Sequence, residues 1–380
     1  MLKRLLSAPL TFLLLLALSA PGASARTPSG FFGVVLDPQL AAGSTPAAID
    51  QQMALMAQSG VQSVRTDFDW ETTEPRAGQY IWGPLDNIVT AAARSHLQLL
   101  PIVEFTPRWA SSHPSRAWDE YAPAKVRTYA AFVTALVDRY GPGGTFWTAN
   151  PALLADPIRA WQIWNEPEGT KYDWRSRPWP STYKALLRAA YIAIHKADRG
   201  ASVVSGALVG LNTTTLTPWA EARDLYAVGA KRYFDVLAVN AFTNAPSVSA
   251  SVKRSLQIVR LVRQVMRAHG DARKPIWVTE VTWTAAKGRI PPSQYAGFET
   301  TAKGQAARLT AYYTEVAAQR PYGIQRAFWY TWGTTYQDKA LFGIPPTFQY
   351  AGLIQWAPTT GSVPLPLLST YHSVAARFEH

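Results

Sequence analysis

The sequence contains no cysteine among its 380 residues. This absence excludes disulfide bonds, zinc–thiolate sites, iron–sulfur clusters and thiol nucleophiles. The six histidines form no His-Glu-x-x-His motif, and the chain has no Gly-x-Ser-x-Gly turn. The common signatures of zinc hydrolases and serine hydrolases are therefore missing as well. We expect the protein to use neither a metal ion nor another cofactor.

Charged residues are also few, and they are unevenly balanced. They make up 16% of the chain, and 37 lysines and arginines against 25 aspartates and glutamates give a net charge of +12. This excess could attract an anionic envelope polymer, or it could form an ordinary solvated basic surface. No recognisable nucleic-acid-binding module appears in the sequence, so we expect no nucleic-acid partner.

The only long apolar run lies near the N-terminus. Lys3 and Arg4 precede an apolar stretch from Leu10 to Ala20, and Ala23-Ser24-Ala25 follows. This order predicts a secretory signal peptide over residues 1–25. The stretch is much shorter than the roughly 20 residues that a membrane-spanning helix needs, so we expect no stable membrane anchor. We expect a secreted or cell-envelope-associated protein with one catalytic domain over residues 26–380.

Short apolar runs alternate eight times with longer helical patterns along the rest of the chain. The runs are Phe31–Asp37, Val61–Thr66, Leu97–Phe105, Ala160–Glu166, Ser202–Leu208, Phe234–Asn240, Ile276–Glu280 and Ala327–Trp332. Continuous apolar strands separated by helices indicate a parallel sheet that is covered on both faces. An open doubly wound sheet would usually carry a glycine-rich phosphate turn after its first strand, and Gly33-Val34-Val35 is not one. We therefore predict an α/β protein, a single (β/α)8 TIM barrel.

Three connections that leave the predicted strands are long, and they are rich in aromatic residues. In a barrel they all lie on the face where active sites are built. Their aromatic residues are Tyr172, Trp174, Trp179, Trp283, Tyr295, Tyr336, Phe348, Tyr350 and Trp356. Any one of them could simply pack in the core, but together they suggest flat platforms for sugar rings.

Two glutamates end apolar strands that face each other across the predicted barrel. Glu166 ends the fourth strand, in Trp-Asn-Glu-Pro, and Glu280 ends the seventh strand. Either one alone would be an ordinary strand-end residue that bonds a helix N-terminus or an arginine. As a pair they can flank one bound molecule, and two carboxylates that flank one bond are what glycoside cleavage requires.

Further motifs surround the two glutamates and extend over nearly the whole predicted domain. They are Val64-Arg65-Thr66-Asp67, Trp70 with Glu74-Pro75, Thr106-Pro107-Arg108-Trp109-Ala110, Tyr140-Gly141-Pro142-Gly143-Gly144 and Trp332. With these motifs the chain resembles the retaining (β/α)8 glycoside hydrolases of clan A, in particular the cellulase-like and β-xylosidase-like families.

The resemblance implies a role for several residues. Glu166 would be the acid/base and Glu280 the nucleophile. Asn165 would bond the sugar 2-hydroxyl, and Trp332 would lie under the ring that is cleaved. Arg65 would keep Glu280 ionised, because a nearby cation lowers the pKa of a carboxyl group. Alternatively, Arg65 forms an ordinary barrel salt bridge and Trp332 fills the core.

The remaining predicted substrate-binding residues are Glu104, Asn240 and Trp283. Glu104 lies where relatives more often have another polar residue, so it could accept a sugar hydroxyl or pair with Arg65 or Arg108. The sixth strand ends Asn240-Ala241-Phe242, where relatives often show a histidine and a tyrosine.

The adjacent pair Asn165-Glu166 sets a structural condition, because strict strand alternation would point the two side chains apart. Both can serve one site only if the strand is bulged or has already ended. The resulting prediction is a monomeric, secreted glycosidase that cleaves O-glycosidic, β-linked bonds by a retaining mechanism. Its carbohydrate substrate would be a poly- or oligosaccharide, with envelope or biofilm polysaccharides among the candidates. The alternative is a cell-surface barrel that binds glycans without cleaving them.

Overall fold

A computed structural model describes residues 27–37, 44–116, 120–168, 174–209, 217–244, 246–334, 345–357 and 361–378. The predicted signal peptide lies outside these described residues, as do Tyr172 and Tyr336. Among the helices of the described parts, none combines the length and apolar character that crossing a membrane requires.

Eight parallel strands form the centre of the molecule. They are β1 (Phe32–Val35), β2 (Ser63–Asp69), β3 (Gln98–Glu104), β4 (Ala160–Ile163), β5 (Ser202–Val204), β6 (Leu237–Asn240), β7 (Ile276–Val281) and β8 (Ile324–Trp329). Their order in the sheet is β5-β4-β3-β2-β1-β8-β7-β6. The two outer strands approach each other through the single bridges Val204–Val236 and Leu208–Val239, which close the ring. The prediction of a (β/α)8 barrel is therefore confirmed.

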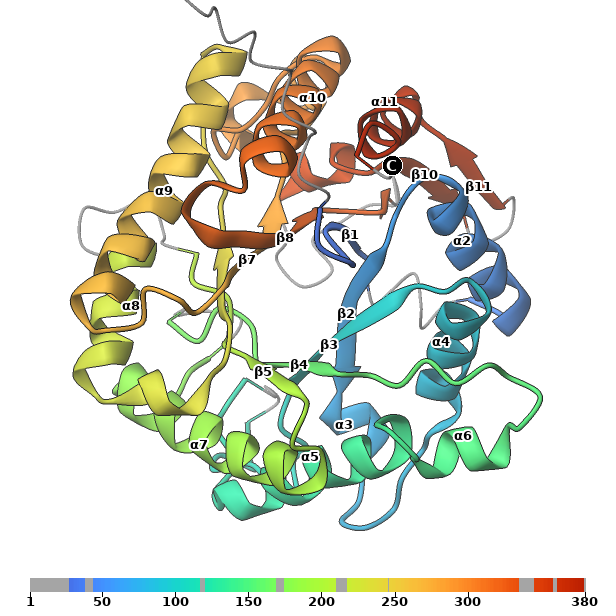
Figure 1. Ribbon diagram of the computed structural model, residues 1–380, viewed down its shortest axis with the longest axis vertical. Coiled ribbons are helices and arrows are strands. Elements are labelled where there is room, and N and C mark those ends of the chain that lie inside the picture. The colour runs from blue at the N-terminus through green and yellow to red at the C-terminus, as the bar shows by residue number, and fades with distance from the viewer. Residues whose placement is uncertain are drawn as a thin grey trace, which may run out of the picture.

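The helices form an outer ring around the strands (Figure 1). The longer ones are α2 (Pro46–Gln58), α4 (Gly83–Arg94), α5 (Val126–Tyr140), α7 (Trp179–Ala197), α8 (Pro218–Ala227), α9 (Val248–Ala268), α10 (Ala302–Gln319) and α11 (Pro366–Ala375). Their starts follow simple local chemistry. The Thr45 hydroxyl accepts the Ala48 N–H, and Pro46 occupies the first turn of α2, where no N–H is needed.

Two cores hold the barrel together. The larger core lies between the strands and the helices. The smaller core fills the barrel interior and includes Val35, Leu100, Ala238, Trp277 and Phe328. These residues come from the inward-facing positions of their strands, which recur with a period of two. Above this apolar layer, polar side chains gather at the end where the strands have their C-termini, which we call the mouth.

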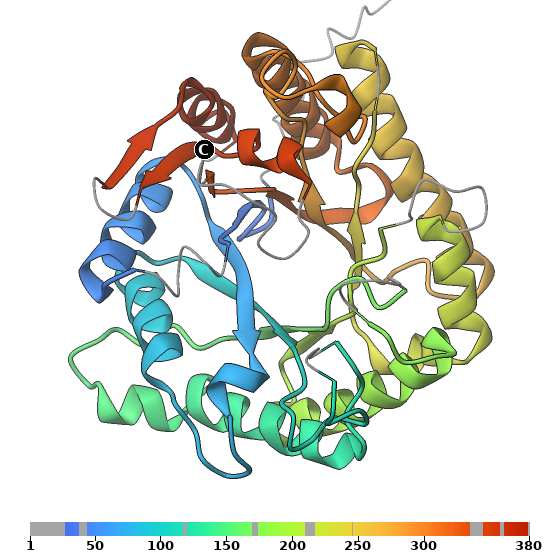
Figure 2. The ribbon, with the colours of Figure 1, turned by 180° about the vertical axis from the view of Figure 1, so that it is seen from behind.

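The connection after β8 contains a small sheet that the sequence analysis did not predict. Strands β9 (Gly333–Thr334), β10 (Ile354–Ala357) and β11 (Gly361–Pro364) form it, and the short helix η5 (Pro346–Tyr350) precedes β10. Seen from the front and from behind, the sheet lies at one edge, beside α2 and α11 (Figures 1 and 2). Gln52 on α2 donates a hydrogen bond to the Ser362 hydroxyl, which ties the sheet to the barrel.

Candidate active site

Asn165 and Glu166 can serve one site only if their strand is bulged or has ended, and the backbone at the end of β4 meets this condition. The end of β7 is irregular as well. Strand β4 ends at Ile163, and both Trp164 and Glu166 adopt left-handed backbone angles, with φ of 65° and 40°. The alternation of side chains therefore stops before Asn165. The pairing of β7 is irregular after Val278. In both segments, neighbouring polar side chains bond groups at the mouth.

Arg65 joins three strands at the mouth. Its guanidinium donates from Nη1 to Glu280 Oε1 at 2.7 Å, from Nη2 to Asn165 Oδ1 at 2.8 Å and from Nε to Gln162 Oε1 at 2.8 Å. Only 1% of the Arg65 residue is exposed. A planar guanidinium that satisfies three partners has little freedom to move. Arg65 therefore fixes Glu280 relative to Asn165, which precedes Glu166.

Asn240 at the end of β6 connects the two glutamates. Its Nδ2 donates to Glu166 Oε1 at 2.8 Å, and Asn240 lies in register beside Glu280, where its amide acts to lower the pKa of that carboxyl group. The hydroxyl of Thr279 donates to Asn240 Oδ1 at 2.8 Å, which fixes the orientation of the amide. Because Asn240 bonds Glu166 and is the register partner of Glu280, the two glutamates lie on either side of one residue at the mouth.

The electrostatics of Glu280 differ from the expectation. Burial raises the pKa of Glu280 above its usual value, while Arg65 and Asn240 act in the opposite direction. Arg65 therefore lowers this pKa as expected, but the removal of the carboxylate from water outweighs the attraction of the cation, so the net shift is upward. The ion pair with Arg65 favours the ionised form of Glu280 against the effect of burial.

Glu104 lies beneath Asn165. It is 3% exposed, and its Oε2 accepts the backbone N–H of Asn165 at 3.1 Å. The sequence left open whether Glu104 accepts a sugar hydroxyl or pairs with an arginine. The structure shows a bond that orients the backbone next to Glu166.

Trp283 and Trp332 are not exposed at the mouth, so their prediction as substrate-binding residues is wrong. Trp332 is fully buried, and its indole N–H donates to Gln52 Oε1 on α2. Trp283 is 1% exposed and donates to the Thr243 carbonyl. Both rings belong to the core between strands and helices, so neither has a face for a sugar. The same burial applies to other aromatic residues predicted on the rim, namely Trp174, Trp179 and Trp356.

Tyr330, two residues before Trp332, is an aromatic residue that lies inside the barrel. It is partly buried and packs on the apolar layer inside the barrel. Burial raises the pKa of Tyr330 well above its usual value, and so do the nearby carboxylates of Asp37, Glu280, Glu166 and Asp67. The ring therefore lies among the acidic groups of the mouth with its hydroxyl protonated. Strand alternation could have found it, because Tyr330 follows inward-facing Phe328 by two positions.

The sequence analysis also missed the acidic character of one side of the mouth. Arg65, Asp67 and Asp69 share the inward face of β2 by alternation, and Asp37 follows β1. Burial raises the pKa of Asp67 to about 7, where Arg65 lowers it and Asp37, Asp69 and Glu280 raise it further. The mouth is thus acidic beside β1 and β2, although the chain as a whole is basic.

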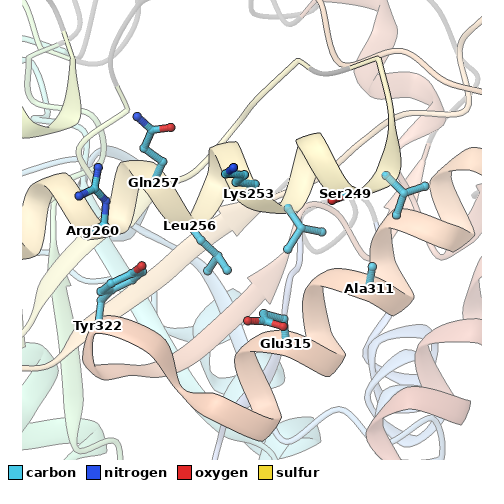
Figure 3. A pocket seen from close by; sticks show the side chains of 10 residues that line it. Ser249, Lys253, Leu256, Gln257, Arg260, Ala311, Glu315 and Tyr322 are labelled. Atoms are coloured by element: carbon cyan, nitrogen blue, oxygen red, sulfur yellow. The ribbon is translucent and has the colours of Figure 1, made fainter.

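A groove of about 780 Å³ lies elsewhere, on the outside of the barrel between α9 and α10 (Figure 3). Its lining includes Leu256, Lys253, Arg260 and Glu315. Glu315 is the single carboxylate in this lining, and neither Glu166 nor Glu280 borders the groove. The groove therefore lacks the paired acids of the mouth.

The comparisons with known proteins point to glycoside hydrolases. A family model described as β-galactosidase, of glycoside hydrolase family 42, matches residues 43–125. This segment includes Arg65 and Glu104 but ends before Glu166 and Glu280. No curated protein sequence matches the chain.

Solved structures share the fold at low sequence identity. A family 39 glycoside hydrolase from Bacteroides cellulosilyticus is 17% identical, with a TM-score of 0.67 over 93% of this chain and 64% of that protein. A glucosidase from Croceicoccus marinus is 13% identical, with a TM-score of 0.65 over 94% of this chain and 69% of that protein. An exo-β-1,4-mannosidase from an Opitutaceae bacterium is 16% identical, with a TM-score of 0.61 over 92% of this chain and 61% of that protein. These matches confirm the resemblance to (β/α)8 glycoside hydrolases, and at such identities they show the fold alone.

Proposed function

We propose that this protein is a glycoside hydrolase that cleaves β-linked O-glycosidic bonds in a poly- or oligosaccharide with retention of configuration. The observation that carries the proposal is the position of Asn240, which bonds Glu166 and lies in register beside Glu280, while Arg65 bonds both Glu280 and Asn165. Two carboxylates that face one space can act on the same acetal, one as an acid and the other as a nucleophile.

The reaction proceeds in two displacements. In the first, Glu280 attacks the anomeric carbon while Glu166 gives its proton to the leaving oxygen, so that a glycosyl ester forms on Glu280. In the second, Glu166 takes a proton from water, and this water attacks the anomeric carbon and releases Glu280. Two inversions leave the configuration of the product unchanged. Proton transfer of this kind contributes about 10²–10⁴ in rate.

Neighbouring residues support these steps. Arg65 balances the charge of Glu280 whenever the carboxylate is free, because its guanidinium lies 2.7 Å from Glu280 Oε1. The oxygen of the Asn165 side chain is held by Arg65, so its Nδ2 is the group that donates to the sugar 2-hydroxyl. Tyr330 provides the aromatic surface for the cleaved ring, in place of Trp332.

The test measures the hydrolysis of a panel of aryl β-glycosides and purified polysaccharides by the natural protein and by three variants. Glu166→Gln and Glu280→Gly should each lower kcat by about 10³-fold or more, since each removes a group needed in the transition state. Azide added to Glu280→Gly should give an α-glycosyl azide from a β-glycoside. Glu315→Gln, in the groove outside the barrel, is the matched control and should keep normal turnover.

Unchanged turnover in Glu280→Gly would refute its role as nucleophile. Binding of a polysaccharide without any hydrolysis by the natural protein would favour the glycan-binding alternative. Envelope and biofilm polysaccharides belong in the panel, since the N-terminal pattern predicts export. Determination of the N-terminus of the exported protein tests that prediction, and a start at Arg26 is expected. Sedimentation of the purified protein tests the expected monomer.

A further inference from the structure

Four aromatic side chains form a continuous surface on one side of the mouth. Phe242, Phe298, Tyr330 and Phe348 are each partly buried, and we call them the aromatic wall. Phe348 lies at the centre of this group. Its ring centroid is 5.1 Å from that of Tyr330, 5.4 Å from that of Phe298 and 5.6 Å from that of Phe242.

The aromatic wall borders the candidate active site. Phe242 follows Asn240 by two residues, and its ring contacts Tyr330 edge to face at 6.1 Å. The backbone N–H of Ala241 donates to the Glu280 carbonyl, which places this segment against the end of β7. Phe298 and Phe348 come from the connections after β7 and β8. The wall is therefore continuous with the space that the two glutamates face.

Three of the four rings in the aromatic wall are purely apolar. The rings of Phe242, Phe298 and Phe348 carry no hydrogen-bond donor or acceptor. A sugar hydroxyl pressed against them loses its water without gaining a partner, which costs binding energy. A methyl group in the same position instead gains apolar contact. The adjoining side of the mouth, beside β1 and β2, carries the carboxyl groups of Asp37 and Asp67, which lie near Tyr330 at the edge of the wall.

We propose that the aromatic wall selects a sugar whose adjacent edge carries a methyl group instead of a hydroxyl, as in a 6-deoxyhexosyl residue. The hydroxyl-bearing edge of the same sugar faces the carboxylates beside β1 and β2. This inference rests on the proposed glycosidase function and adds the substrate class. It also assigns Phe242 and Phe348 as residues that determine specificity without taking part in the reaction.

The experiment compares aryl β-glycosides that differ only at carbon 6. The pairs are 4-nitrophenyl β-D-fucoside with the β-D-galactoside, and 4-nitrophenyl 6-deoxy-β-D-glucoside with the β-D-glucoside. We expect kcat/KM to be about 10-fold or more higher for the deoxy member of at least one pair, which is the range that one small group in an apolar pocket produces. Phe242→Tyr and Phe348→Tyr each add a hydroxyl to the wall and should bring the ratio towards one.

The control is Phe378→Tyr, a partly buried phenylalanine near the end of the chain that packs against Phe32 and should leave the ratio unchanged. Equal or lower activity on the deoxy sugar in both pairs would overturn the inference while the glycosidase function stands. A ratio that neither wall variant changes would overturn it too.

Ligand-observed NMR on Glu166→Gln keeps the inference testable if no aryl glycoside is cleaved. Methyl β-D-fucoside and methyl β-D-galactoside are the probes, and we expect the strongest saturation transfer at the methyl group of the deoxy sugar. Equal binding of both probes, or transfer confined to other protons, would overturn the inference. Failure of hydrolysis together with this methyl contact would refute only the proposed catalysis.

Discussion

Removal of the Arg65 side chain is the most direct perturbation of the mouth. Arg65 is 1% exposed and bonds Glu280, Asn165 and Gln162 at 2.7–2.8 Å. Arg65→Met keeps much of the apolar stem but leaves the Glu280 carboxylate without its cation. Loss of one partner from a buried ion pair costs about 3–5 kcal/mol, because the remaining charge stays out of water.

This cost can be converted into a shift of the melting temperature. The entropy of unfolding is about 2.1 cal/mol/K per residue. A destabilisation of about 3–5 kcal/mol should therefore lower the Tm of a barrel of roughly 350 residues by about 4–7 °C. Differential scanning calorimetry at pH 7 measures the shift. The double variant Arg65→Met/Glu280→Gln removes both charges and should recover most of the loss, since a neutral pair needs no counter-ion.

The pH dependence gives the sign of the effect. Burial already raises the pKa of Glu280, and Arg65 opposes that rise. Without Arg65 the pKa rises further, so the folded protein holds a proton that the unfolded chain releases more readily. Stability then falls as the pH rises from the usual glutamate pKa towards the new one. The Tm deficit of Arg65→Met should therefore be small at pH 5 and larger at pH 8. A deficit below 1 °C at both pH values would refute the reasoning.

Three further outcomes are expected. Asp67→Asn removes a carboxyl group whose pKa is raised to about 7, and ionisation of this buried group destabilises the natural protein as the pH rises from about 4 to about 7. The Tm of the variant should therefore fall less over this pH range than the Tm of the natural protein. Trp332→Phe should lower Tm and leave KM unchanged, because the ring packs in the core and bonds Gln52; a higher KM at unchanged Tm would contradict this placement. An aryl β-glucuronide should have a lower kcat/KM than the matching aryl β-glucoside, because the acidic side of the mouth repels its carboxylate. This difference should be smaller in Asp67→Asn. Equal kcat/KM values for the two substrates at low salt would exclude the effect.

Much of the architecture could be predicted because its signals are local. The barrel follows from eight repeats of an apolar run and a helical pattern, and Thr45-Pro46 marks a helix start through chemistry confined to one turn. Glu166 and Glu280 stand out because an acidic residue at the tip of an apolar strand is unusual. Closure of the ring then determines that the two strand tips face each other.

The errors concern contacts between distant segments. Trp332 is conspicuous in the sequence, but only the fold shows that its N–H reaches Gln52, 280 positions earlier. Tyr330 lies inside the barrel because alternation continues inward from Phe328, a signal that was present but not used. The pKa of Glu280 depends on a balance between burial and one cation, and this balance needs distances that no sequence pattern contains.

The closure of the barrel between β5 and β6 has a dynamic consequence. Its bridges are isolated, and one backbone N–H, that of Ala238, donates to the Ser205 hydroxyl instead of a carbonyl. Amide hydrogens along this junction should exchange with deuterium earlier than those of the continuous pairing between β2 and β3. Glu166 and Asn240 belong to segments on opposite sides of the junction. A bulky chain that enters between them therefore meets the barrel at its least regular pairing, where the hydrogen bond from Asn240 to Glu166 is the contact that it must break.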